Sequence, residues 1–242
     1  MTTRPLPLAP GVAQAKPKPG GFASAPRVQT SLLAAAEKRT LLWLAERMPR
    51  WVHSDHLTVL GMAAMIFAGL SYWWSRYNRY GLLGVIVCLA LNWFGDSLDG
   101  TIARFRDCQR PRYGFYVDHM VDAFSMLVLL AGLALSGYMS FAVATLLLVA
   151  YLLLAIEVYL TTYTIGTFTL SFFRFSPTEL RIVLSIGNLA LFLQNHPRVH
   201  CFGHVYSLFD FGGTIGGVCM LVVVLVSFVR NTHRLYVEER IR

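Results

Sequence analysis

Four aspartates in the middle of the chain have the types and the spacing of a catalytic cluster. Asp96 and Asp99 are three residues apart, and Asp118 and Asp122 are four residues apart. Residues at either spacing lie on the same face of a helix, so each pair projects from one side of its own helix. Because the pairs are close in the sequence, we expect the four carboxylates to converge from two adjacent helices.

Carboxylates at the membrane end of an apolar helix are costly unless they are paired or bind a metal ion. Hard oxygen ligands suit Mg²⁺ or Mn²⁺, and two such ions about 3.5–4 Å apart serve displacement reactions at phosphorus. Gly100 and Ala103 leave the same helix face bare, which allows a flat nucleotide to approach the backbone. The pattern therefore predicts a two-metal site, with Mg²⁺ or Mn²⁺, for chemistry at phosphorus.

The helices that carry these aspartates are apolar enough to cross a membrane. The 242 residues are 55% hydrophobic and 14% charged, with a mean hydropathy of +0.52, whereas soluble domains are about 45–50% apolar and about 25% charged. Six apolar stretches of about 18 to 23 residues are each long enough to span a bilayer. They cover residues 57–75, 81–98, 115–136, 138–160, 177–194 and 211–229. We predict an all-α polytopic membrane protein with six transmembrane helices.

The N-terminal region differs from the rest in composition. Residues 1–30 are rich in proline and predict a disordered cytoplasmic tail. Residues 31–50 have apolar positions at helical spacing between charged ones, which predicts an amphipathic helix on the cytoplasmic face; a merely solvated helix is the alternative. Residues 51–242 then form the six-helix membrane catalytic domain.

The distribution of positive charge predicts the topology. The net charge is +8, and with the N-terminus inside, eighteen of the 21 Lys and Arg residues fall on the inner side. Only Arg76, Arg79 and Arg198 fall outside. The positive-inside rule therefore places both termini and the active site in the cytoplasm. Because topology accounts for the excess of cations, we expect no nucleic-acid partner.

The aspartates belong to a longer pattern, D-x2-D-G-x2-A-R followed by G-x3-D-x3-D. Eight positions match it: Asp96, Asp99, Gly100, Ala103, Arg104, Gly114, Asp118 and Asp122. The pattern resembles the class I signature of the CDP-alcohol phosphotransferase family, also called the CDP-alcohol phosphatidyltransferase family. Members of this family are integral membrane enzymes of phospholipid synthesis.

The resemblance implies a role for each aspartate. It implies that Asp96, Asp99 and Asp118 hold the metal ions. Asp122 completes the cluster and acts as the general base. The implied reaction is attack of an alcohol oxygen on the phosphorus distal to the cytidine, which expels CMP.

The resemblance also implies a nucleotide site. Its residues are Gly100 and Ala103 against the cytidine, Arg104 near the phosphates, and Gly114. From the sequence alone, a positive-inside anchor is the alternative role for Arg104.

Two donors remain open. The stretches Glu157-Val-Tyr159 and Asp118-His119-x-x-Asp122 are similar to the choline and ethanolamine phosphotransferase branch, in which CDP-choline or CDP-ethanolamine donates to diacylglycerol. The chain is much shorter than eukaryotic members, and compact bacterial relatives use CDP-diacylglycerol and a polar alcohol. We favour CDP-diacylglycerol as donor, and a bacterial plasma membrane over the endoplasmic reticulum.

Four further residues are candidates for binding substrate. Glu157 lies deep in the fourth apolar stretch, where an unpaired acid is costly; pairing with a buried Tyr or Arg is the alternative. His119 lies between two of the carboxylates, as a donor to them or as a helix-boundary residue. Arg174 and Arg181 lie near the fifth stretch, as phosphate ligands or as membrane anchors.

Other function classes give different expectations. An ion-coupled transporter would use the same intramembrane acids as an ion path, but the sequence has no inverted repeat. A membrane scaffold has no need for four acids at this spacing. The expected partners of the enzyme are a CDP-linked lipid or amino-alcohol donor, an alcohol acceptor and the lipid bilayer. The glycine spacings Gly212–Gly216 and Gly213–Gly217 indicate either a homodimer contact or close packing within one chain.

Overall fold

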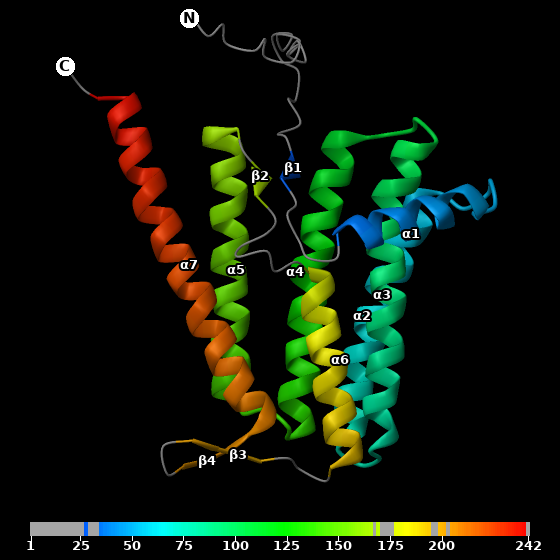
Figure 1. The fold of residues 1–242 in the computed structure, drawn as a ribbon, viewed down its shortest axis with the longest axis vertical. Coiled ribbons are helices and arrows are strands. Elements are labelled where there is room, and N and C mark those ends of the chain that lie inside the picture. Colours follow the sequence, from blue (N-terminus) through cyan, green and yellow to red (C-terminus); the bar gives the residue numbers. More distant parts are fainter. Residues whose placement is uncertain are drawn as a thin grey trace, which may run out of the picture.

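The fold consists almost entirely of helices. The computed structural model describes residues 27–28, 34–166, 168–169, 177–194, 198–201 and 204–240. Within these residues the helices are α1 (Ala34–Arg47), α2 (Ser54–Ser75), α3 (Tyr80–Phe105), α4 (Pro111–Ser136), α5 (Phe141–Ile165), α6 (Pro177–Leu193) and α7 (Leu208–Glu238) (Figure 1). The predicted all-α fold class is confirmed. The predicted tail falls outside the described residues apart from 27–28, and so does Arg174.

Two short strand pairs join the helices. β1 (Arg27–Val28) pairs in parallel with β2 (Phe168–Thr169). β3 (Arg198–Cys201) pairs antiparallel with β4 (His204–Ser207), and this hairpin lies at the opposite end of the molecule from α1 (Figure 1). The sequence analysis predicted neither pair.

Five of the described helices, α2, α3, α4, α5 and α7, are long and apolar enough to cross a membrane. The chain is therefore an integral membrane protein. α6 has 17 residues, at the lower end of the range of about 17–25 for a transmembrane helix, so the sixth span stays a prediction. α5 begins at Phe141 because Gly137, at φ 84°, ends α4 in the left-handed region and Ser140 then caps α5.

α2, α3 and α4 form the tightly packed half of the molecule. Their buried side chains include Tyr72, Leu82 and Leu133. α2 and α4 approach closely where Gly69 faces Gly132. A Cβ atom at position 132 would overlap the carbonyl oxygen of Gly69. Glycine is required there by the contact between two backbones.

α5 and α7 form a pair that hydrogen bonds hold together at the hairpin end. At the hairpin end, Ser140 N–H donates to Asp210 Oδ1 over 2.7 Å, and Ser207 Oγ donates to the Tyr138 carbonyl over 3.0 Å. Between the ends, a Cβ atom at Gly213 would lie 2.7 Å from Val143 of α5, whereas one at Gly212 would meet nothing within 4 Å. The row through Gly213 thus serves packing within the chain, and a dimer contact through Gly212 stays a prediction.

α1 lies crosswise to α2 and α3 at one end of the bundle (Figure 1). Its Leu41 and Ala45 are buried with Leu57, Leu98 and Ile102 of the following helices. α1 lies within residues 31–50, for which the sequence predicts an amphipathic helix on the cytoplasmic face. Its contact with a lipid surface stays a prediction.

The connection between α1 and α2 is fixed from α3. The guanidinium of Arg106, which caps α3, donates to the carbonyls of Met48, Pro49, Arg50 and Val52. This arginine ties α1 to the membrane helices.

Candidate active site

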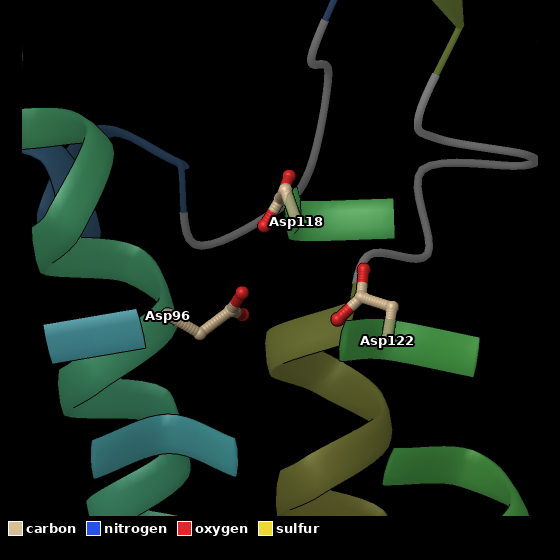
Figure 2. Close-up of side chains that lie close together, drawn as sticks. All are labelled: Asp96, Asp118 and Asp122. Carbon is tan, nitrogen blue, oxygen red and sulfur yellow. The ribbon is translucent and has the colours of Figure 1, made fainter. Parts of the chain in front are cut away.

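Three of the four aspartates meet between α3 and α4. Asp96, Asp118 and Asp122 each offer one carboxylate oxygen, and these three oxygens lie within 4.8 Å of one another. Figure 2 shows Asp96 reaching from α3 toward Asp118 and Asp122, which lie on successive turns of α4. All three side chains are half-buried. The helical spacing of Asp118 and Asp122 places both on the face of α4 that is turned toward α3.

Asp99 lies apart from these three but lines the same small cavity. Its Oδ2 accepts a hydrogen bond from Thr58 Oγ1 of α2 at 2.6 Å, and its Oδ1 accepts one from the Gly100 N–H. The cavity is lined by Thr58, Gly61, Met62, Asn92, Asp96, Asp99, Asp118, Val121 and Asp122. Asp99 therefore contributes to the wall on the side of α2.

α2 and α3 approach each other closely next to residues that line the cavity. A Cβ atom at Gly95 would lie 2.6 Å from the Leu57 carbonyl oxygen, so only glycine fits beside the α2 backbone. The adjacent residue is Asp96. This contact sets how far the Asp96 carboxylate stands from α2.

The positive partner of the cluster is Arg181, from the second turn of α6. Its Nη2 lies 2.5 Å from Asp96 Oδ2, and its Nε donates to Asn92 Oδ1 at 2.8 Å. Asn92 in turn donates to the Gly61 carbonyl at 3.1 Å. The sequence singled out Arg181 as a phosphate ligand or an anchor; the structure places it on a carboxylate of the cluster.

The predicted nucleotide residues lie at the open side of the site. A Cβ atom at Gly100 would meet only the guanidinium of Arg104, at 3.3 Å, and one at Gly114 would meet nothing within 4 Å. Arg104 is exposed and donates to Thr101 Oγ1 at 3.3 Å. Ala103 is half-buried on the same helix. This end of α3 has room for a flat group beside its backbone.

Comparison with known families agrees with this geometry. The sequence model of the CDP-alcohol phosphatidyltransferase family matches residues 51–229, which include all eight residues of the aspartate pattern. The chain belongs to the CDP-alcohol phosphatidyltransferase family. Comparison with curated proteins gave no match. As a CDP-alcohol phosphatidyltransferase family member, the chain is a transferase of phosphate-containing groups, in a family that depends on metal ions.

In this family member, an aromatic group from α4 and α5 lies beside the aspartates. The His119 ring lies 4.1 Å from the Phe115 ring and 4.6 Å from the Tyr159 ring, and its Nδ1 is 2.6 Å from the Phe115 carbonyl oxygen. His119 Nδ1 also lies 4.0 Å from Asp118 Oδ2. Tyr159 brings α5 to the edge of the site.

Glu157 has its partners on α5 and α7. Its Oε1 accepts from Thr161 Oγ1 at 2.9 Å and from Asn231 Nδ2 at 2.8 Å. The sequence left a buried Tyr or Arg open as the partner, and the structure instead gives an amide and a hydroxyl. These bonds fasten α5 to α7, and a contact of Glu157 with substrate stays a prediction.

Three residues with polar contacts in the structure have no role that the sequence alone predicts: Thr58, Asn92 and Asn231. Thr58 comes from a different helix than its partner Asp99, so no local spacing links them. Asn92 had a usable signal, because it lies four residues before Asp96 and therefore on the same face of α3. Asn231 lies 74 residues from Glu157, beyond the reach of any local pattern.

Proposed function

We propose that this membrane transferase moves a phosphatidyl group from CDP-diacylglycerol to the hydroxyl of a polar alcohol and releases CMP. The observation that carries the proposal is the convergence of Asp96, Asp118 and Asp122 within 4.8 Å between two apolar helices. We propose that the site lies on the cytoplasmic side of the membrane, because most Lys and Arg residues fall at that end of the helices. A bacterial plasma membrane is the location we favour.

The carboxylates suit Mg²⁺ or Mn²⁺. Two oxygens bound to one Mg²⁺ at about 2.1 Å are at most about 4.2 Å apart, and the three aspartate oxygens lie within 4.8 Å of one another. Small rotations of the side chains therefore bring them to the distances of a shared ion. Asp99, which lines the same cavity, supplies carboxylate oxygens for a second ion. When bound, the ions neutralise charge on the pyrophosphate and on the departing CMP.

Asp122 is the proposed general base. It lies on the face of α4 that is turned toward Asp96, and it is half-buried, so that a hydroxyl is able to reach it. Asp122 takes the hydroxyl proton as the alcohol oxygen bonds to the phosphorus distal to the cytidine. The bond from that phosphorus to the bridging oxygen breaks, and CMP leaves with the electron pair.

Gly100, Ala103, Arg104 and Gly114 form the proposed nucleotide site. The nearest atoms to a Cβ at Gly100 are those of the exposed Arg104 guanidinium. We propose that this guanidinium moves onto a phosphate of the donor and thereby makes room for the cytidine beside Gly100. Arg181 compensates the charge of Asp96 and holds that carboxylate in place.

The second candidate is transfer from CDP-choline or CDP-ethanolamine to diacylglycerol. The aromatic group of Phe115, His119 and Tyr159 favours it, because aromatic faces attract ammonium groups and these rings lie next to Asp118. In that case the headgroup of the donor would lie against α5.

One assay separates the two candidates. Purified protein with Mn²⁺ receives either CDP-diacylglycerol with a panel of polar alcohols, or CDP-choline and CDP-ethanolamine with diacylglycerol. Mass spectrometry identifies the lipid product, and CMP release is measured beside it. The proposal predicts product from the first mixture, whereas product only from the second would establish the alternative. Absence of CMP from both would refute the proposed function.

A further inference from the structure

One carboxylate outside the matched family region joins three helices. Glu37 lies in the first turn of α1 and precedes the region 51–229. Its Oε1 accepts from Thr178 Oγ1 of α6 at 2.7 Å, from Trp93 Nε1 of α3 at 3.0 Å, and more weakly from Ser97 Oγ at 3.5 Å. Residues 35, 36, 38, 39 and 40 around Glu37 are all exposed, whereas Glu37 is half-buried. The helix turns one acid inward.

The partners of Glu37 flank the catalytic carboxylate. On α3, Trp93 comes three residues before Asp96, and Ser97 comes directly after it. On α6, Thr178 comes one turn before Arg181, whose guanidinium binds Asp96 at 2.5 Å. The contacts thus link Glu37 to Thr178, Arg181 of the same helix to Asp96, and Trp93 of α3 back to Glu37.

These contacts hold the N-terminal end of α6. Toward the hairpin end, Asn188 Nδ2 of α6 donates to the Tyr72 hydroxyl of α2 at 2.8 Å, in a fully buried contact. At the start of α6, Thr178 donates to Glu37, and Arg181 in the second turn binds Asn92 and Asp96. Hydrogen bonds to an ionised carboxylate are about twice as strong as neutral ones, so Glu37 has a large influence on the first turn.

We propose that Glu37 is a positioning residue, which fixes the first turns of α6 through Thr178 and thereby holds Arg181 against Asp96. α1 buries Leu41 and Ala45 but exposes Leu42 and Trp43, an apolar edge suited to lipid. The seating of α1 at the membrane surface is therefore mechanically linked to the geometry of the active site. The inference rests on the proposed function where it is tested by CMP release. Its second test, the affinity for Mn²⁺, needs no catalytic activity.

Three variants of the full chain test the proposal. Glu37→Ala removes the acceptor, Glu37→Gln retains a side-chain oxygen at the same reach, and Glu46→Ala removes an exposed acid from the same helix. We measure kcat for CMP release per folded molecule, and the Kd of Mn²⁺ alone by electron paramagnetic resonance. Because a misplacement of about 1 Å costs up to 10²-fold in rate, we expect Glu37→Ala to lower kcat about 10-fold. The same variant should bind Mn²⁺ at least about threefold more tightly, since a released Arg181 competes less for Asp96.

These opposite signs distinguish positioning from general damage, which would weaken both turnover and metal binding. Glu37→Gln should stay within about twofold of the wild type in both readouts, and Glu46→Ala should match the wild type. In an Arg181→Lys background, Glu37→Ala should have little further effect, as expected when two residues act through one contact. Unchanged kcat and Mn²⁺ affinity in Glu37→Ala, or a loss in Glu37→Gln as large as in Glu37→Ala, would overturn the proposal. If the wild type releases no CMP, the proposed function fails, and the Mn²⁺ titration alone decides the role of Glu37.

Discussion

The half of the molecule built from α2, α3 and α4 differs sharply from the α5–α7 pair. In the most apolar 18-residue stretch of each helix, the buried share is 39% for α2, α3 and α4, but 11% for α5 and 17% for α7. The first half holds the aspartates and glycines at backbone contacts, whereas the pair is the more apolar and leaves most of its surface uncovered. The comparison indicates that the first half positions charged groups by close packing.

The largest effect should come from an acid in the first half. Asp122→Asn should lower turnover about 10³-fold, because the amide does not accept the hydroxyl proton. Mn²⁺ binding should be reduced less, since Asp96 and Asp118 remain. The matched control is Asp210→Asn on α7, which keeps the oxygen that accepts from Ser140 N–H and should retain full turnover. CMP release by both variants tests the contrast, and an active Asp122→Asn enzyme would break it.

A pair of glycine substitutions compares packing in the two halves. Gly132→Ala forces a Cβ atom into the Gly69 carbonyl, and overpacking of this kind costs about 1–3 kcal/mol or more. Gly212→Ala places its Cβ where nothing lies within 4 Å, and it gains up to about 1 kcal/mol of helix propensity. Thermal unfolding in detergent should therefore show a lowered midpoint for the first variant alone. Equal midpoints would mean that α2 and α4 do not approach as closely as described.

Gly100→Leu tests the open side of the site. The leucine fills the space beside α3 and should raise the KM for the CDP-linked donor about 10-fold, equivalent to about 1.4 kcal/mol of binding. Thermal stability should change little, because the added Cβ meets only the flexible Arg104 side chain. An unchanged KM would remove Gly100 from the nucleotide site.

The smallest effect should come from the polar contact inside the α5–α7 pair. Asn231→Ala removes the amide that donates to Glu157 and Thr161. Glu157 keeps the hydrogen bond from Thr161, so the loss in stability should be that of a typical hydrogen bond, about 0.5–1.5 kcal/mol. Unfolding should shift accordingly while kcat stays within about twofold. A kcat that falls with the stability would show that Glu157 belongs to the substrate site.

The helices could be predicted from the sequence because their apolar stretches are long and bounded. The stretches at 57–75 and 81–98 lie within α2 and α3, whose ends depend on turns in the local sequence. The hairpin of β3 and β4 was not predicted, because each strand has only four residues, which is too short for an alternating pattern to stand out from a loop. Local periodicity therefore specified the spans and missed the hairpin that joins two of them.

The site could be predicted in part for the same reason. Helical spacing suffices to bring Asp118 and Asp122 to one face of α4, and Asp96 follows from the neighbouring helix. The partners of Asp96 and Asp99 were beyond prediction, because Arg181 and Thr58 come from α6 and α2 and meet the aspartates only after the bundle has packed. Glu37 was read only as part of an amphipathic pattern, since its three contacts depend on how α1 lies across the bundle.

The most direct test of the central claim is CMP release before and after metal removal. Full-length protein in lipid nanodiscs receives CDP-diacylglycerol and the alcohol acceptor found by the product assay. It is then treated with a chelator and resupplied with Mn²⁺ or Mg²⁺. We expect CMP release to stop on chelation, to return with either ion in the wild type, and not to return in Asp96→Asn or Asp118→Asn. CMP release that persists in the chelator, or that these two substitutions leave intact, would contradict an active site built on the aspartates of α3 and α4.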